Sequence, residues 1–289
     1  MSNSYLTALD DAIASHGPKQ SEYTIINNAF TNAYTKNKEE VLSVFSTLRY
    51  KVNAFHQLDS IAGFSFQRPH GYAGDFEMID RLYTEYISAD ETIERWDRFA
   101  QAQPAAKAVR NRKNYFKGLL LNEPVRSVLN LASGPGRDMK EFYDANPGSK
   151  VVVDCVEWDQ KAIAFASQLL KQHPVTFTRK NVLRFVPMKN YDLIWSSGLF
   201  DYFSDRVFVL LLTRMLLHLN PGGQLVVGNF ADTNPNRAFM EVVMNWHLNY
   251  RSVAQLEALA VEAGARPSAV TVCKEPEGVN LFLHIRKQQ

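Results

Sequence analysis

The stretch Val128-Leu-Asn-Leu-Ala-Ser-Gly-Pro-Gly-Arg-Asp138 puts two glycines directly after a short apolar run. The apolar run predicts a buried strand, and the residues after the glycines predict a helix. Because Gly134 and Gly136 carry no Cβ atom, the backbone between strand and helix can bend sharply and bring its N–H groups against a ligand. The stretch therefore predicts a strand, a ligand-binding turn and a helix in that order.

An acidic residue follows where this kind of turn requires one. Twenty-three positions after Gly134, Glu157 ends a second apolar run, Val151-Val-Val-Asp-Cys-Val-Glu157. In an open α/β sheet, an acid at the end of the second strand accepts hydrogen bonds from the hydroxyls of a ribose. Met139 stands where a dinucleotide-binding fingerprint has its third glycine. The pattern therefore indicates a nucleoside-bearing ligand and disfavours a nicotinamide dinucleotide.

Strands and helices are predicted to alternate from Val125 onwards. We expect strands at Ser127–Ala132, Lys150–Val156, Val175–Arg179, Tyr191–Ser196, Gln224–Asn229, Ala269–Lys274 and Asn280–Ile285. The intervening helices are expected at Asp138–Asn146, Gln160–His173, Asp205–Leu219 (capped by Ser204 and closed by Asn220-Pro-Gly-Gly223) and Val253–Ala263. This alternation predicts an α/β fold with a parallel, doubly wound sheet. The short turn Glu275–Gly278 makes the last two strands antiparallel to each other.

The N-terminal part of the chain is predicted to be helical. Apolar residues at three- and four-residue spacing predict helices over Ser43–Ile61 and Phe76–Ile87. The segment Gln67-Arg-Pro-His-Gly-Tyr-Ala-Gly-Asp75 interrupts them with one proline and two glycines. This segment is therefore expected to be a loop between helices.

A second break, at Gln101–Ala106, precedes a predicted connecting helix over Lys107–Leu121. We therefore expect two domains, with residues 1–105 forming a helical cap or lid and residues 106–289 forming a Rossmann-like sheet domain. The 289 residues are enough for such an arrangement.

Composition narrows the class of protein. Hydrophobic residues make up 46% of the chain, which excludes a disordered or fibrous protein. The net charge is only +2, and the basic cluster Lys107–Lys113 is interpreted as a solvated helix face, so no nucleic acid or membrane partner is expected. Cys155 and Cys273 are interpreted as small buried hydrophobes, and the histidines lack the spacing of a metal site. We expect a cytoplasmic protein with a small-molecule partner, as a monomer or homodimer.

Seven strands that end in an antiparallel hairpin, with a glycine turn after the first strand and an acid after the second, resemble the class I S-adenosylmethionine (SAM) dependent methyltransferase fold over residues 107–289. Further segments narrow the resemblance: Gly71-Tyr-Ala-Gly-Asp75, Gly198-Leu-Phe-Asp-Tyr-Phe-Ser-Asp-Arg206, Gly228-Asn-Phe230, Asn234-Pro-Asn-Arg237, Trp246-His-Leu-Asn-Tyr-Arg251 and Glu275-Pro-Glu-Gly-Val-Asn-Leu-Phe282. Together they look like bacterial proteins of 3-hydroxypalmitic acid methyl ester biosynthesis, an extracellular signal. More distantly, the chain resembles methyltransferase-like azetidine-2-carboxylate synthases.

The resemblance implies a set of SAM-binding residues at the ends of the first four strands. It implies that the glycine turn holds the methionine part of SAM, that Glu157 holds the ribose hydroxyls and that Trp158 lies beside the adenine. Asn181 would contact the adenine amine, with the backbone of Val182 next to it. The implied cofactor-binding residues are Ala132, Ser133, Gly134, Gly136, Glu157, Trp158, Asn181, Val182, Ser196 and Ser197.

Two positions depart from the commonest pattern of that fold, which has an acid at Asn130 and a glycine at Ala132. A neutral amide at Asn130 favours the charged α-ammonium of SAM less than an acid would. Either neutral residues at these positions are compatible with methyl transfer, or they adapt the site to another reaction.

The candidate catalytic residues are His70, Tyr72, Asp75, Asn130 and Arg251. Tyr72 could press its aromatic face towards the sulfonium of SAM, and Arg251 could clamp a carboxylate. His70 and Asp75 could equally be capping residues of an ordinary turn between helices. Asp201, Tyr202 and Asp205 are interpreted as helix-entry and packing residues.

Three functions remain open from the sequence. The first is methyl transfer from SAM to a carboxylate or acyl metabolite, which needs no strong base because a carboxylate is already ionised at neutral pH. The second is cyclisation of SAM itself, in which the α-amine attacks the γ-carbon and methylthioadenosine leaves; the neutral Asn130 would help, because the amine must first lose its proton. The third is a SAM-binding module without catalytic activity.

Overall fold

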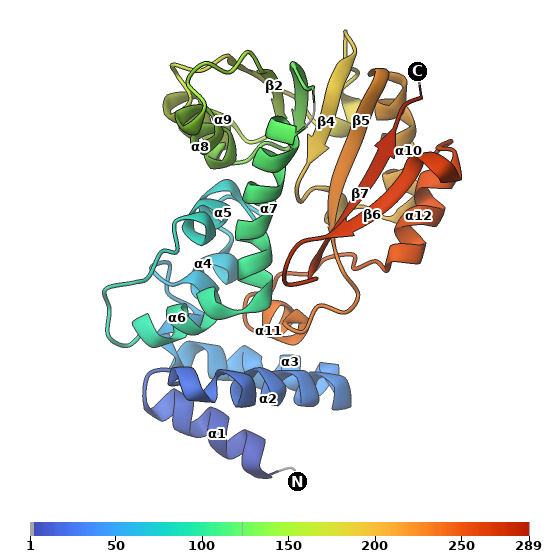
Figure 1. The fold of residues 1–289 in the computed structure, drawn as a ribbon. Coiled ribbons are helices and arrows are strands. Elements are labelled where there is room, and N and C mark those ends of the chain that lie inside the picture. The colour runs from blue at the N-terminus through green and yellow to red at the C-terminus, as the bar shows by residue number, and fades with distance from the viewer. Residues whose placement is uncertain (1–2, 123, 289) are drawn as a thin grey trace. The chain divides into compact units, whose positions relative to one another are not determined.

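The computed structural model describes residues 3–122 and 124–288, and the chain separates into two compact units (Figure 1). The helical unit contains the chain up to Lys107 together with Asn234–His247. The sheet unit contains Ala108–Thr233 and the chain from Leu248. The placement of Asn234–His247 among the helices was not expected from the sequence, which put this segment with the sheet.

The sheet unit confirms the predicted α/β fold. Its strands are β1 (Ser127–Leu131), β2 (Val152–Glu157), β3 (Val175–Arg179), β4 (Tyr191–Ser196), β5 (Leu219–Phe230), β6 (Val270–Lys274) and β7 (Asn280–Arg286). They form one seven-stranded sheet in the order β3-β2-β1-β4-β5-β7-β6. The first five strands pair in parallel, and β7 is antiparallel to both β5 and β6. This is the sheet of class I methyltransferases.

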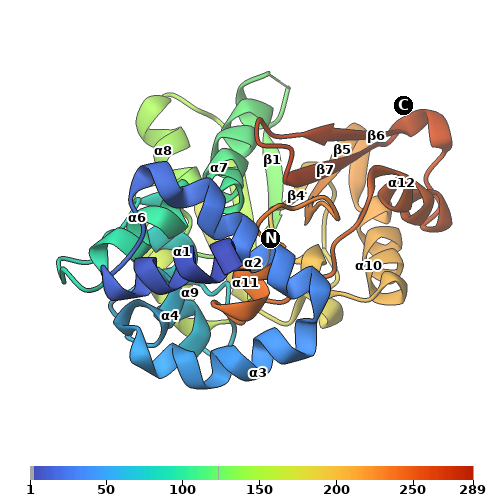
Figure 2. The ribbon, with the colours of Figure 1, turned by 90° about the horizontal axis from the view of Figure 1, so that it is seen from below.

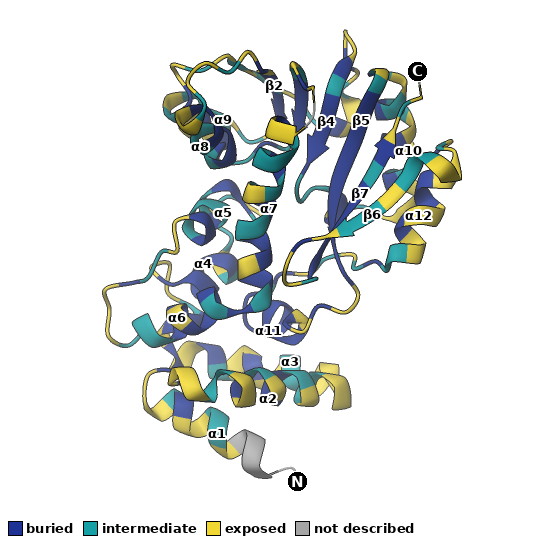
Figure 3. Cartoon of the chain, in the orientation of Figure 1, coloured by how far each residue is buried: buried dark blue, intermediate teal, exposed yellow. Residues whose placement is uncertain are grey.

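Alternate side chains of the strands build one apolar core on each face of the sheet. Leu129, Ile194 and Leu225 point into the core that α10 (Asp205–Leu217) and α12 (Val253–Glu262) complete. Val128, Leu193 and Val226 point into the opposite core, which contains side chains of α7 (Pro104–Asn122) and α8 (Arg137–Ala145). The central strands are dark blue over most of their length in Figure 3, because both of their faces are covered there.

Two predicted element ends in the sheet unit need correction. Ser204 precedes α10 as expected, but its side chain makes no capping hydrogen bond. The predicted loop Asn220–Gly223 is part of the long strand β5, which pairs with β4 from Leu219 onwards with an irregularity near Tyr191. The remaining helix of this unit is α9 (Gln160–Leu169), which Asp159 caps by accepting the N–H of Lys161.

The first helices of the chain, drawn in blue and teal in Figure 2, belong to the helical unit. The core of this unit is rich in aromatic side chains. Its helices are α1 (Asn3–Ala14), α2 (Tyr23–Lys36), α3 (Lys38–Leu48), α4 (Ile61–Gln67), α5 (Phe76–Tyr83), α6 (Glu94–Ala102), the start of α7, and α11 (Arg237–Val242). Phe239 of α11 packs edge-on against Phe30 of α2 and Phe99 of α6, with ring centroids 5.4 and 5.2 Å apart. This contact explains why α11 belongs to the helical unit.

Within the described residues, no helix combines the length and apolar character that crossing a membrane requires.

The predicted helix Ser43–Ile61 is wrong as a single element. The helix α3 stops at Leu48, and two short 3-10 turns precede α4. Ser60 starts α4 because its hydroxyl accepts the N–H of Gly63 and donates to the carbonyl of Ala54. The buried positions Val52 and Phe55 fit this broken path as well as a continuous helix, so their spacing could not reveal the break.

A buried arginine, Arg49, connects the C-terminal end of α11 with the segment between α3 and α4 by hydrogen bonds. The Arg49 guanidinium donates to the carbonyls of Phe55, Val242 and Val243, and it lies 3.6 Å from the ring centre of Phe66. Burial without a carboxylate partner lowers the pKa of Arg49 to about 10. The cation therefore sits at the C-terminal end of α11, where free helix carbonyls and the helix dipole favour a positive charge.

Candidate ligand site at the carboxyl edge of the sheet

The strand order reverses at β1, which has β2 on one side and β4 on the other. In open α/β sheets, ligands bind outside the carboxyl ends of the strands at such a switch point. Ser196, at the end of β4, donates its hydroxyl to the carbonyl of Leu131 over 3.0 Å and is fully buried. Ser196 therefore fixes the ends of β1 and β4 to each other, and Ser197 follows at the open edge.

The glycine turn after β1 adopts the left-handed backbone region three times, at Ala132 (φ 55°), Gly134 (φ 56°) and Gly136 (φ 71°). A Cβ on Gly136 would lie 2.8 Å from Leu170 Cδ1, so this glycine permits close packing inside the protein. A Cβ on Gly134 would meet nothing within 4 Å. Gly134 therefore leaves free space beside the turn, which fits the close approach of a ligand.

Glu157 links the turn to the end of β2. Its Oε2 accepts the N–H of Gly134 over 3.1 Å, and its Oε1 accepts the N–H groups of Trp158 and Asp159 over 2.7 and 3.0 Å. The residue is 7% exposed. Three backbone donors thus hold the carboxylate at the carboxyl edge, and Oε2, which accepts only one of them, keeps acceptor capacity for a ligand hydroxyl.

The residues expected around an adenine also lie along this edge. The Trp158 side chain is 64% exposed, and the Arg179 guanidinium lies 5.8 Å from its ring centre. Asn181 caps the short 3-10 turn Val182–Arg184 by accepting the N–H of Leu183, and Val182, the first residue of that turn, is buried. An exposed indole next to a fixed acid is a suitable surface for a planar base.

Asn130 and Ala132, the two positions that depart from the commonest methyltransferase pattern, differ in their surroundings and backbone conformation. Asn130 is 2% exposed, and its amide nitrogen lies 3.9 Å from the Met139 sulfur. Its neutral side chain is therefore almost completely shielded from water. Ala132 holds a backbone conformation that favours glycine, which costs about 1 kcal/mol for a residue with a Cβ. The hydroxyl of Ser133 is buried without a hydrogen-bond partner among the described residues.

Arg251 is not a free carboxylate clamp. Its Nε and Nη2 donate to Asp205, its Nη1 donates to Asn229 over 2.7 Å, and further bonds reach the carbonyls of Phe200 and Phe203. The residue is only 3% exposed. Because every N–H of the guanidinium has a protein acceptor, Arg251 holds the segments after β4 and β5 together instead of binding a ligand.

The remaining catalytic candidates belong to the helical unit, within the Gln67–Asp75 segment and its neighbours. Asp75 caps α5 by accepting the N–H of Met78 over 2.8 Å, and burial raises the pKa of its carboxyl. The His70 Nε2 lies 3.0 Å from a Glu77 oxygen, while its Nδ1 and the Asp75 Oδ2 are buried without described hydrogen-bond partners. Tyr72 is 37% exposed. Asp75 thus has the capping role considered above, and the catalytic roles of these residues stay predictions.

One residue of the site was missed by the sequence analysis. Arg112 lies within the basic cluster that we interpreted as a solvated helix face, yet it is only 4% exposed. It shares the buried face of α7 with Val109, Phe116 and Leu120. An arginine at helical spacing within an apolar stripe is the signal that would have revealed it.

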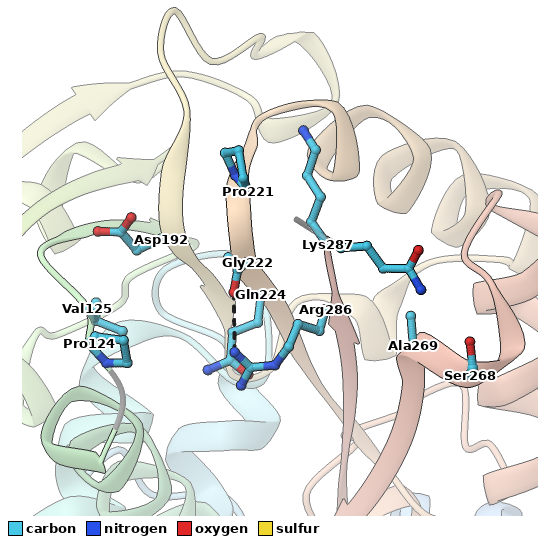
Figure 4. A pocket seen from close by; sticks show the side chains of 12 residues that line it. Pro124, Val125, Asp192, Pro221, Gly222, Gln224, Ser268, Ala269, Arg286 and Lys287 are labelled. Carbon is cyan, nitrogen blue, oxygen red and sulfur yellow. Dashed lines mark hydrogen bonds between the residues drawn. The ribbon is translucent and has the colours of Figure 1, made fainter.

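A separate cavity of about 500 Å³ opens at the opposite, amino end of the strands (Figure 4). Its charged groups already have protein partners. Asp192 accepts the N–H groups of Arg126 and Ser127, Arg286 donates to the carbonyl of Gly222, and Lys287 donates to that of Leu219. The residue types that fit a nucleoside lie at the carboxyl edge instead.

Comparison with known proteins agrees with this geometry. Residues 128–223 match the family model described as a methyltransferase domain. Similar structures include a possible exported protein from Bordetella parapertussis (TM-score 0.62, 21% identity, covering 74% of this chain and 80% of that chain). An O-methyltransferase family protein from Burkholderia thailandensis is also similar (TM-score 0.50, 16% identity, 67% and 63% covered). A third is the SAM-dependent methyltransferase SibL (TM-score 0.52, 15% identity, 90% and 77% covered).

A search of the curated proteins gives no match to this sequence. The chain has the class I methyltransferase fold, and the matched domain contains the glycine turn, Glu157 and the ends of β1 to β4. The domain and the fold together support an enzyme that uses SAM.

Proposed function

We propose that this protein transfers the methyl group of SAM to the carboxylate of a small acyl metabolite, of the class represented by 3-hydroxypalmitic acid. The observation that carries the proposal is the hydrogen bond between Glu157 and Gly134, which joins an acid suited to a ribose to a turn with open space beside it. Both residues lie in the matched methyltransferase domain.

In this proposal the carboxyl edge of the sheet holds SAM. Ala132, Ser133, Gly134 and Gly136 form the turn beside its methionine part. Glu157 accepts the ribose hydroxyls, while Trp158, Asn181 and Val182 surround the adenine, and Ser196 and Ser197 border the methionine side. The residues fit SAM because the turn offers backbone N–H groups and the acid is fixed before the ligand arrives.

For methyl transfer to a carboxylate, the main task of the protein is to align the acceptor oxygen with the methyl group of SAM. The sulfonium of SAM makes its methyl carbon electrophilic, so a carboxylate oxygen attacks that carbon while the carbon–sulfur bond breaks. The products are a methyl ester and S-adenosylhomocysteine, and no proton has to be removed from an ionised carboxylate. Side chains that orient the acceptor and exclude water then supply most of the rate.

SAM cyclisation is a second candidate, favoured by the buried, neutral Asn130. Here the unprotonated α-amine would attack the γ-carbon, the bond from that carbon to sulfur would break, and methylthioadenosine would leave as azetidine-2-carboxylate forms. An acid at position 130 would stabilise the ammonium form, which cannot attack. Asn130 removes that obstacle.

We further propose that residues 1–105 act as a cap, with His70, Tyr72 and Asp75 contacting the acceptor. The physiological partner would be a small molecule and not a nucleic acid or a membrane, and the protein would act in the cytoplasm as a monomer or homodimer. The nearly balanced charge, 32 basic against 30 acidic residues, supports this view of its partners.

The deciding experiment incubates the purified protein with SAM, first alone and then with 3-hydroxypalmitate, and identifies the products by mass spectrometry. S-adenosylhomocysteine and methyl ester that form only with the acid would support methyl transfer. Methylthioadenosine with azetidine-2-carboxylate, formed from SAM alone, would replace it with cyclisation. Binding of SAM without turnover of either kind would favour a non-catalytic module, and Glu157→Gln should weaken SAM binding in every case.

A further inference from the structure

Arg112 is a buried cation with few partners. Its guanidinium has five N–H groups, but among the described residues it makes a single hydrogen bond, from Nη1 to the carbonyl of Ser197 over 3.1 Å. Its Nε is buried without a partner. Arg251, by comparison, is equally buried and has all of its N–H groups engaged. Arg112 therefore keeps most of its hydrogen-bonding capacity free.

Gly198 makes room for this side chain at the carboxyl edge, and Gly228 makes room for the Ser197 carbonyl to which it donates. A Cβ on Gly198 would lie 2.4 Å from Arg112 Nη1, so only glycine lets the guanidinium reach this position. A Cβ on Gly228 would lie 2.3 Å from the carbonyl oxygen of Ser197. The guanidinium also lies 5.9 Å from the ring centre of Phe230, at the end of β5. It is thus built into the edge where β4 and β5 end.

The neighbouring acids do not neutralise Arg112. Within the part of the chain that the structure describes, no carboxylate oxygen lies within 4 Å of its guanidinium nitrogens. Asp201 is close enough to feel its charge, but the Asp201 Oδ1 accepts the backbone N–H of Phe230. A buried guanidinium without an ion-pair partner at a ligand edge is suited to bind an anion.

We propose that Arg112 binds the carboxylate of a ligand at the carboxyl edge of the sheet. A planar guanidinium with free donors matches a carboxylate through two parallel hydrogen bonds. Two carboxylates could meet it, the methionyl carboxylate of SAM and the carboxylate of the methyl acceptor. If the ligand is SAM, the inference rests on the proposed use of SAM. If the ligand is the methyl acceptor, it rests on the proposal that the acceptor is a carboxylic acid.

The test compares Arg112→Gln with the wild-type protein by calorimetric titration. The probes are S-adenosylhomocysteine, which has the same amino-acid carboxylate as SAM, and methylthioadenosine, which lacks it. If Arg112 binds that carboxylate, the variant should lose about tenfold to a hundredfold in affinity for S-adenosylhomocysteine and nothing for methylthioadenosine. If Arg112 binds the acceptor instead, both nucleosides should bind normally and the affinity for 3-hydroxypalmitate should fall by a similar factor.

Two control variants separate charge, geometry and folding. Arg126→Gln removes an exposed arginine at the other end of the strands and should change no affinity. Arg112→Lys keeps the charge but not the planar fork, and it should recover only part of the lost affinity. Thermal melting of each variant shows whether the fold is intact.

Equal losses for both nucleosides would assign Arg112 a purely structural role and overturn the inference. Unchanged affinity for S-adenosylhomocysteine and for 3-hydroxypalmitate would overturn it as well. If the wild-type protein binds neither nucleoside, the proposed function fails, and the titration with 3-hydroxypalmitate alone decides the role of Arg112.

Discussion

Two buried carboxylates, Glu241 in the helical unit and Asp201 in the sheet unit, are held in opposite ways. In the helical unit, Glu241 is 3% exposed and accepts from Lys38, Tyr34 and Arg237, with His247 Nδ1 at 3.3 Å. These partners outweigh the cost of burial and lower the pKa of Glu241 to about 2.

For Asp201 in the sheet unit, the cost of burial outweighs the favourable interactions of the carboxylate. Asp201 accepts the backbone N–H of Phe230 and feels the charges of Arg112 and Arg251, yet desolvation raises the pKa of its carboxyl to about 6. The comparison teaches that a buried acid keeps its charge at little cost only where charged side chains from distant segments converge on it. Where backbone N–H groups are its nearest partners, desolvation raises the pKa of its carboxyl, and Asp97 of the helical unit, with a pKa raised to about 6, resembles Asp201 in this respect.

The largest expected effect comes from removing the Glu241 charge. Glu241→Gln should lower the free energy of unfolding by about 3 kcal/mol at pH 7, because its cationic neighbours lose their common partner. Since the folded-state pKa lies below the unfolded one, this stability is present above about pH 4.5 and is lost as the pH falls towards 2.

Denaturant titration at pH 7 and at pH 2.5 measures this difference. The exposed residue Glu39 on α3 provides a matched control, and Glu39→Gln should stay within about 0.5 kcal/mol of the wild type. A Glu241→Gln protein that is as stable as the wild type at pH 7 would contradict the role assigned to this cluster.

A methyl group at Gly136 tests the close packing of the sheet unit. Gly136→Ala should cost about 2 to 3 kcal/mol, because the new Cβ meets Leu170 and the backbone keeps a positive φ. Gly134→Ala should cost only about 1 kcal/mol, from its backbone conformation, but should weaken the binding of S-adenosylhomocysteine at least tenfold.

Thermal melting and calorimetric titration of the two variants separate packing from ligand approach. Gly148→Ala is the control, since a Cβ there meets nothing and the backbone is not left-handed. Equal stability and equal affinity of the Gly134 and Gly136 variants would show that the two glycines have the same task, contrary to the structure.

The buried acid of the sheet unit is expected to respond to pH in the opposite sense to Glu241. Because the pKa of Asp201 is raised on folding, its anion destabilises the protein above about pH 6, and this cost disappears as the pH falls towards 3.8. Asp201→Asn should therefore stabilise the protein by about 2 kcal/mol at pH 7 and by much less at pH 4. Unfolding of both proteins across this pH range measures the difference, and a constant gap would contradict it.

The smallest expected effect is at the strained residue of the glycine turn. Ala132→Gly should relieve the left-handed conformation and raise the free energy of unfolding by at most about 1 kcal/mol, since the added freedom of the unfolded chain offsets part of the gain. Thermal melting of the variant and the wild type measures this difference, and the melting temperature should rise slightly. A fall in stability would mean that the Ala132 methyl group contributes packing that outweighs the strain.

Much of the sheet unit could be predicted from the sequence, because its signals are local. The strand before Gly134, the turn and the acid Glu157 follow from residues that are neighbours along the chain, and apolar runs mark the other strands. The helical unit was harder. The turns after Leu48 carry apolar residues at spacings that also fit a helix, and only the contacts of Ser60 and Arg49 show where the helix breaks.

By itself, the sequence determined the seven strands, the glycine turn with its acid and the class of ligand, because hydrogen-bonded strands and a left-handed turn depend on local residue types. The tertiary structure decided that Arg251 is fully engaged, that Arg112 is buried with free donors, and that the segment around Phe239 packs among the helices. Whether a charged side chain meets water, a protein acceptor or a ligand depends on groups brought together from distant positions. Gly198, which admits Arg112, is one such group that no local pattern could have identified.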